Sequence, residues 1–254
     1  MPRQTPPFRA DMVGSLLRTA PLKAARARHE QGAITDDELR SVEDAEIRKI
    51  IRRQEEIGLA AVTDGEFRRA FWHFDFLEHL DGVEGYWADH GVQFQGTQLK
   101  PKGIRVTGPL GFTGHPMLEH FRFLKANTAR VPKMTIPSPS MLHYRGGRQV
   151  IDAKVYPEME DFYADLGRAY AGAVAAFAAE GCRYLQLDDV SFAYLCDPEQ
   201  RRMLAERGDD PVRQPAIYAG MLNAAIAGRP KDMTITMHLC RGNFRSTWIA
   251  SGGY

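Results

Sequence analysis

His238 and Cys240 have the residue types and the spacing of two metal ligands. They follow the run Met233–Met237, which we expect to form a strand, and side chains two residues apart on a strand point to the same face. Imidazole nitrogen and thiolate sulfur are ligands that suit zinc. A tetrahedral protein site needs three or four ligands, so this pair supplies half of one, and a purely structural role for both residues stays open.

Carboxylates follow two other predicted strands. Asp188 and Asp189 come after the run Arg183–Leu187, and Glu66 comes after a glycine at which the backbone can turn sharply. Because adjacent residues at a strand end face opposite ways, only one of the two aspartates would bind a substrate ammonium group or act as a base. The alternatives are a helix N-cap or loop salt bridge for the aspartates and a solvated turn for Glu66.

The dipeptide Gly14-Ser15 ends the first predicted strand. Its backbone N–H groups and its hydroxyl could bind a carboxylate, although an ordinary turn between a strand and a helix explains the same residues. Ser138, Ser140 and His143 are the residue types of a nucleophile and a base. Neither serine lies in a GxSxG motif, so we do not expect a serine hydrolase.

Short apolar runs alternate with helical patterns along the chain. Strands are predicted over Ala10–Gly14, Ala60–Thr63, Ile104–Thr107, Lys133–Ile136, Arg183–Leu187 and Met233–Met237. Helices are predicted after Gly32, where Thr35 and Glu38 form a capping box and Gly58 closes the helix, and over Glu160–Glu180, Glu199–Glu206 and Pro211–Gly228. This alternation predicts βαβ units and a mostly parallel sheet.

Polar residues at the carboxyl ends of successive parallel strands describe the active-site face of a (β/α)₈ barrel. An open doubly wound sheet is the alternative, but the glycine-rich phosphate motifs that usually accompany it are absent from the sequence. We expect one domain over residues 1–254, with an aromatic-rich segment at 71–98 that leaves the barrel to cover the site or forms a packed hairpin. The six predicted strands fall short of eight, and the sequence ends in a turn-like Ser251–Tyr254, so we expect a C-terminally truncated barrel.

Composition excludes several classes of protein. Lys and Arg number 33 and Asp and Glu 32, and this balance gives no electrostatic signature for nucleic acid or an anionic membrane. The longest uncharged apolar stretch, Ala169–Ala179, is too short to span a bilayer, and the N-terminal residues lack the apolar region of a secretory signal. Three cysteines favour a reducing cytoplasm over a disulfide framework. The expected partners are small molecules, and the sequence is compatible with a homo-oligomer.

Four segments together resemble one family: Val13–Thr19, Thr63–Glu66, Leu185–Asp189 and His238–Phe244. In this order, each at a strand end, they are similar to the catalytic barrel of cobalamin-independent methionine synthase. The similarity is greatest to the short single-barrel members, the 5-methyltetrahydropteroyltriglutamate–homocysteine methyltransferase-like proteins, and it runs from about Phe8 to Tyr254. It implies a TIM barrel of the uroporphyrinogen decarboxylase and methionine synthase type.

The resemblance also implies a site and a reaction. His238 and Cys240 match two zinc ligands, Ser15 and Glu66 match positions that hold the amino-acid part of homocysteine, and Asp188 matches the aspartate that binds its ammonium group. The expected activity is zinc-dependent methyl transfer, in which a zinc-bound thiolate of homocysteine or a related thiol attacks the methyl group of a donor such as a folate.

This sequence departs from the family in two respects. The family completes its zinc site with a glutamate and a second cysteine further along the chain, and no cysteine follows Cys240. The loop Ser138–Tyr144 lacks the tryptophan that stacks on the folate in the long enzymes. Three alternatives therefore stay open: a zinc-dependent alkyl or epoxide transferase acting on another thiol, a metal-free lyase of the decarboxylase branch, and a catalytically inactive barrel with a binding role.

Overall fold

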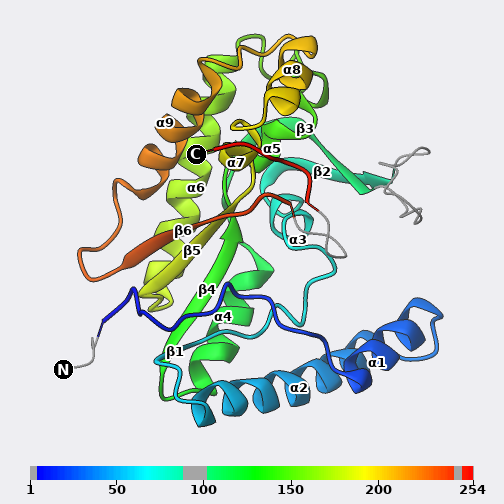
Figure 1. Ribbon diagram of the computed structural model, residues 1–254. Helices are drawn as coiled ribbons and strands as arrows, with labels where there is room; N and C mark the ends of the chain where they lie inside the picture. The colour runs from blue at the N-terminus through cyan, green and yellow to red at the C-terminus, as the bar shows by residue number, and fades with distance from the viewer. Residues whose placement is uncertain (1–4, 88–101, 243–247, 254) are drawn as a thin grey trace.

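A parallel sheet of four strands forms the centre of the molecule (Figure 1). The computed structural model describes residues 5–87, 102–242 and 248–253. In spatial order the strands of this sheet are β1 (Ala61–Val62), β4 (Val131–Pro137), β5 (Tyr184–Asp189) and β6 (Thr234–Leu239). Four of the six predicted strands thus form this sheet, and the α/β class with a parallel sheet is confirmed.

The longer strands alternate between an apolar and a polar face, as the two-residue period of a strand requires. Ile136, Leu185 and Leu187 belong to the main hydrophobic core. The intervening positions carry polar side chains, and the strand register places them in rows: Thr135 pairs with Gln186, and Asp188 pairs with His238. The sheet therefore has one apolar face, which packs on helices, and one polar face, which could form a site.

Local sequence determines the helices that flank the sheet. In α2 (Asp36–Glu56) the expected capping box is present, since Glu38 N donates to Thr35 Oγ1 (3.3 Å) and Thr35 N donates to the Glu38 carboxylate (2.8 Å). Gly58 adopts the left-handed conformation that ends the helix (φ +87°). Helices α6 (Met159–Ala179) and α8 (Pro198–Glu206) match their predicted ranges closely.

The helix predicted from Pro211 begins later. The chain turns over residues 211–213, and α9 runs over Gln214–Ile226 with Pro215 in its first turn. The Asp210 carboxylate accepts hydrogen bonds from Val212 N and Arg213 N, which holds the turn. In the described residues the sequence reading also missed α1 (Ala20–Glu30), α3 (Phe74–Leu77), α4 (Pro116–Ala126), α5 (Met141–Tyr144), α7 (Ser191–Tyr194) and a 3₁₀ turn over Gly147–Val150.

Of the other two strand predictions, one was wrong, and one was right about the strand but not about the parallel sheet that it was expected to join. Residues 10–14 form no strand, because their carbonyl groups accept hydrogen bonds from side chains of the sheet and not from a neighbouring strand. The segment Ile104–Thr107 lies in β3 (Lys102–Gly111), which pairs antiparallel with β2 (Asp81–Trp87) in a separate hairpin. Of the aromatic-rich segment predicted at 71–98, residues 71–87 form α3 and β2, and the remainder lies outside the described residues.

Helices and the N-terminal segment lie on opposite faces of the parallel sheet (Figure 1). The apolar face packs on α6, and α9 packs in turn on α6. The extended segment Pro6–Gly14 crosses the polar face. Strand order follows chain order, as it does around a barrel, but the four described parallel strands do not close. No described helix has the length and apolar character needed to cross a membrane.

Candidate functional site

Asp188 and His238 meet at the carboxyl ends of β5 and β6. Their backbones are paired in the sheet register, and His238 Nδ1 lies 3.2 Å from Asp188 Oδ1. Because an ionised carboxylate only accepts hydrogen bonds, the imidazole donates from Nδ1. This leaves Nε2 as the ring nitrogen that could bind a metal. A carboxylate behind a ligating imidazole is the usual arrangement at metal sites.

Glu66 approaches the same region from the loop after β1. Its backbone is left-handed (φ +58°), a conformation that few residues other than glycine adopt, and its N–H donates to Asp64 Oδ1 (2.8 Å). The carboxylate is 4% exposed and accepts from Thr135 Oγ1 (2.9 Å). Burial raises the pKa of Glu66, Arg69 opposes this rise, and the nearby Asp188 carboxylate adds to it. The structure therefore brings Glu66 and Asp188 together.

Arginines fix the loop that carries Glu66. Arg18 donates from Nη2 to the carbonyl groups of Glu66 (3.2 Å) and Arg69 (2.7 Å), which closes the turn from the inside. On the outer side, Arg68 donates to Asp44 Oδ1 (2.5 Å) on α2. A strained backbone persists only where its surroundings over-determine it, and these contacts supply that restraint.

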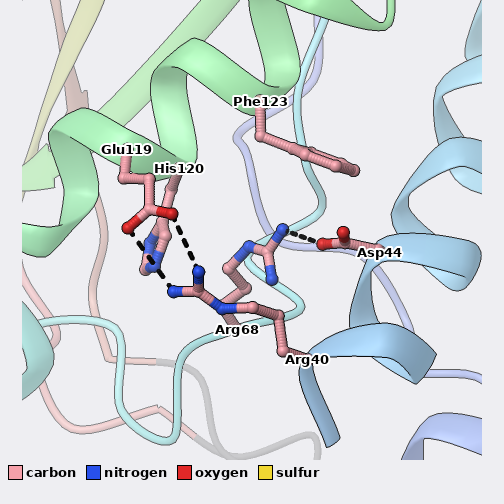
Figure 2. A pocket seen from close by; sticks show the side chains of 6 residues that line it. All are labelled: Arg40, Asp44, Arg68, Glu119, His120 and Phe123. Atoms are coloured by element: carbon pink, nitrogen blue, oxygen red, sulfur yellow. Dashed lines mark hydrogen bonds and ion pairs between the residues drawn. The ribbon is translucent and has the colours of Figure 1, made fainter. Parts of the chain in front are cut away.

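Arg68 also lines a small cavity of about 50 Å³ between α2 and α4, behind the Glu66 loop (Figure 2). Figure 2 shows Arg40 pointing at Glu119 and Arg68 pointing at Asp44. The remaining lining residues are His120 and Phe123. Positive and negative side chains are matched here, so the arrangement is that of a structural ion-pair cluster.

Gly14 packs directly against the Glu66 carboxylate. Its φ of +138° excludes most side chains, and a methyl group at this position would lie 2.7 Å from Thr135 Cγ2 and 3.1 Å from Glu66 Oε1. Thr63 Oγ1 donates to the Gly14 carbonyl (2.7 Å). The neighbouring Ser15 is exposed. The predicted Gly14-Ser15 segment, Glu66 and Asp188 thus lie around one region of the polar face.

Cys240 follows β6, and its N–H donates to the Asp189 carbonyl (3.0 Å). The side chain is half-buried and packs at the edge of the main core. Within residues 5–87, 102–242 and 248–253, no group of three or more His, Cys, Asp and Glu side chains could hold a metal. Among the described residues, His238 and Cys240 are therefore not part of such a group.

Asp189 has a different role from Asp188. Its buried carboxylate accepts from Ser191 Oγ (2.9 Å) and Phe192 N (2.9 Å) at the start of α7, and from Ser140 Oγ. Asp189 therefore binds the first turn of α7 from the position before Val190, which is the N-cap residue itself. His143 Nδ1 contacts Tyr218 Oη (2.8 Å), and the described contacts of its imidazole are with Tyr218, Tyr163 and Asp209 and not with either predicted serine.

Sequence reasoning missed two residues of the polar face, Thr135 and Gln186. Gln186 Nε2 donates to Asp188 Oδ1 (2.7 Å) and to the Val13 carbonyl (2.6 Å). Each of them lies between two apolar residues of its strand, Thr135 between Met134 and Ile136 and Gln186 between Leu185 and Leu187. A polar residue in that pattern is the signal that could have identified them.

Comparison with known proteins places this arrangement in a family. Residues 8–250 match the family model for the catalytic domain of cobalamin-independent synthase. The uncharacterized proteins YxjH and YxjG of Bacillus subtilis (strain 168) are 50% identical over 249 residues and 49% identical over 253 residues. These alignments cover 98% and 99% of this chain but 65% and 66% of the relatives, so the chain spans about two thirds of their length.

A more distant relative carries a functional name. The 5-methyltetrahydropteroyltriglutamate–homocysteine methyltransferase of Thermotoga petrophila is 26% identical over 246 residues, which is 94% of this chain and 30% of that enzyme.

Solved structures agree with the family. The putative vitamin-B12 independent methionine synthase of Listeria monocytogenes superimposes with a TM-score of 0.80 at 47% identity, over 94% of this chain and 67% of that one. A B12-independent methionine synthase from Shewanella, solved in complex with selenomethionine, superimposes with a TM-score of 0.58 at 20% identity, over 83% of this chain and 55% of that one. This second comparison shows a likeness in fold alone. The chain belongs to the family of the cobalamin-independent synthase catalytic domain.

Proposed function

We propose that this chain carries out zinc-dependent methyl transfer to a thiol, with homocysteine as the first acceptor to test and a methylated folate as the first donor. The observation that carries the proposal is the joining of Asp188 to His238 beside the buried Glu66. Carboxylates that could bind an amino acid thereby stand next to a residue that could bind the metal.

The chain's own residues would bind and orient the acceptor. Ionised Glu66 and Asp188 are hydrogen-bond acceptors, so together they suit the ammonium group of an amino acid. The N–H groups of the Gly14-Ser15 segment and the Ser15 hydroxyl would receive its carboxylate. Holding the amino-acid end in this way directs the thiol toward one place and removes orientational freedom before reaction.

His238 and Cys240 would hold the metal. An imidazole nitrogen and a thiolate sulfur suit zinc, and the Asp188 contact supplies the partner that orients such an imidazole. When bound, zinc favours the thiolate form of a coordinated thiol at neutral pH. A protein zinc site needs at least one ligand more than this pair.

Metal content tests this part of the proposal. We expect near-stoichiometric zinc in the purified protein, measured by elemental analysis, and its loss in the double variant His238→Ala/Cys240→Ala. The matched control is His29→Ala/Cys196→Ala, which removes a histidine and a half-buried cysteine elsewhere. Zinc retained in the first variant, or absent from the parent protein, would contradict the proposal.

Transfer of a labelled methyl group from methyltetrahydrofolate to homocysteine tests the reaction. Removing one charged hydrogen-bond acceptor weakens binding by about tenfold or more, so Glu66→Gln and Asp188→Asn should raise KM for homocysteine by that factor. Product formed only with a different thiol would favour the alkyl transferase. Methyl transfer that survives His238→Ala/Cys240→Ala would contradict its dependence on these two residues.

A further inference from the structure

Gln186 joins two parts of the candidate site that lie far apart in the sequence. It stands in the middle of β5, is nearly fully buried, and its Nε2 group donates both to Asp188 Oδ1 (2.7 Å) and to the Val13 carbonyl (2.6 Å). Neither acceptor can donate, so the amide nitrogen must face them, and its two N–H bonds are both used. This amide can therefore take only one orientation.

The Gln186 amide orients the Asp188 carboxylate. Oδ1 of Asp188 receives one hydrogen bond from Gln186 and another from His238 Nδ1 (3.2 Å). Two donors on one oxygen hold the plane of the carboxylate. Oδ2 is then the oxygen that can accept from an ammonium group. Without Gln186, the carboxylate would rotate about its side-chain bonds with only His238 to restrain it.

The same amide holds the segment that leads into Gly14-Ser15. The Val13 carbonyl immediately precedes Gly14, which packs on the Glu66 carboxylate. Gln186 thus ties the backbone on one side of the region to the carboxylate on the other side. A single side chain fixes the relative position of the groups that would receive the two ends of an amino acid.

We propose that Gln186 is a positioning residue for amino-acid recognition, acting through Asp188 and the Val13–Ser15 backbone. This inference rests on the proposed function, because it takes homocysteine to be bound through its ammonium group. It predicts that Gln186 contributes to the preference for a thiol that carries an amino group over one that does not. A residue with a merely structural role would affect the two thiols equally.

Direct binding to two probes tests this difference. The probes are homocysteine and 4-mercaptobutyrate, which keeps the thiol and the carboxylate but lacks the amino group. Because both carry the thiol, any contribution from a bound metal cancels in the ratio of their dissociation constants, measured by calorimetry on the full chain. We expect the parent protein to prefer homocysteine, and Gln186→Leu to reduce this preference by about tenfold.

Two further variants complete the design. Gln186→Met replaces the amide with an unbranched side chain of similar length and serves if Gln186→Leu folds poorly, as judged by circular dichroism. Gln214→Leu is the matched control, since Gln214 is also a buried glutamine, and its Nε2 donates to Tyr163 Oη (3.3 Å) between α9 and α6. We expect it to keep the full preference for homocysteine.

The outcomes separate the two proposals. A parent protein that shows no preference for homocysteine overturns the ammonium-binding part of the proposed function. A parent that prefers homocysteine, with folded Gln186 variants that prefer it equally, overturns the role of Gln186 alone. Equal weakening of both probes by the Gln186 variants also overturns it, because that result is what lost packing would give.

Discussion

Gly14 and Glu66 are two residues in unusual backbone conformations that touch each other. Gly14 has a φ of +138° and Glu66 a φ of +58°, and a side chain on the glycine would collide with Thr135 and the Glu66 carboxylate. Left-handed or otherwise strained backbone at a non-glycine residue costs about 1–3 kcal/mol. Its presence at the proposed ammonium-binding carboxylate fits a site in which precise placement of that group matters.

Replacement of Gly14 by alanine should therefore be harmful in two ways. We expect Gly14→Ala to lower the free energy of unfolding by about 2–4 kcal/mol, from strain and from the collision, and to weaken homocysteine binding. Urea denaturation and calorimetry would measure these effects. Gly32→Ala is the control, because Gly32 also has a positive φ (+70°) but no atom within 4 Å of the added methyl group. Equal destabilisation by both variants would argue against the Glu66 contact.

Glu66 should also make stability depend on pH. Burial raises its pKa in the folded protein above the ordinary value of 4.5, so the folded state keeps the proton to a higher pH than the unfolded state does. The contribution is favourable below pH 4.5 and is lost as the pH rises through the folded-state pKa. We expect Glu66→Gln to remove this fall in the free energy of unfolding. Urea titrations at several pH values would measure it. The half-exposed Glu84→Gln is the control and should leave the profile unchanged.

At the scale of elements, the beginning of α4 depends on a buried histidine. His115 Nδ1 accepts from Met117 N (3.1 Å), and Nε2 donates to the Phe76 carbonyl (3.0 Å), which links α4 to α3. Burial lowers the pKa of His115 from 6.5 to about 4. The neutral imidazole is therefore part of the helix cap, and protonation would remove the acceptor on which the cap depends.

Acid should weaken the protein through this cap. Since the folded-state pKa of His115 lies below the unfolded value, its contribution is complete above pH 6.5 and is lost between pH 6.5 and about 4, by about 1.4 kcal/mol per pH unit. We expect His115→Asn, which keeps a capping side chain, to make the slope shallower by that amount in urea titrations. His29→Asn is the control on an exposed ion pair. An unchanged slope in His115→Asn would contradict the assignment.

At the scale of the whole molecule, the N-terminal segment Pro6–Gly14 connects the strands across their polar face. The main anchor is Lys133 on β4, whose side chain is 1% exposed. Its Nζ donates to Asp11 Oδ2 (3.1 Å) and to the Met12 carbonyl (2.5 Å). A buried ammonium group needs such partners, because an unpaired charge in the interior is strongly unfavourable.

Loss of this anchor should affect overall stability. Breaking a buried ion pair costs about 3–5 kcal/mol, so we expect Lys133→Met to lower the urea midpoint strongly. Lys49→Met is the matched control, since Lys49 is 61% exposed and its pair with Glu46 should contribute less than about 1 kcal/mol. If the two variants were equally stable, the segment would not be held by Lys133 in the way that the structure indicates.

Features set by near neighbours could be predicted from the sequence. The capping box of Thr35 and Glu38, the glycine that ends α2, and the runs that became β4, β5 and β6 all depend on side chains within a few residues. The residues that could do chemistry were also recognisable, because Glu66, Asp188 and His238 each come at or just beyond the end of a strand. Their types and positions were local properties of the chain.

Only the tertiary structure decided how these parts meet. The sequence of residues 10–14 is typical of a strand, yet their carbonyl groups accept hydrogen bonds from the side chains of Lys133 and Gln186. Gln186 is 173 positions away in the sequence from its acceptor, Val13. Ile104–Thr107 pairs with β2 in a hairpin because a nearby antiparallel partner was available. The alternation of side chains along a strand depends on its own sequence, whereas the choice of hydrogen-bond partner depends on distant segments that compete for the same carbonyl and N–H groups. For that reason the role of Gln186 became visible only when the chain was folded.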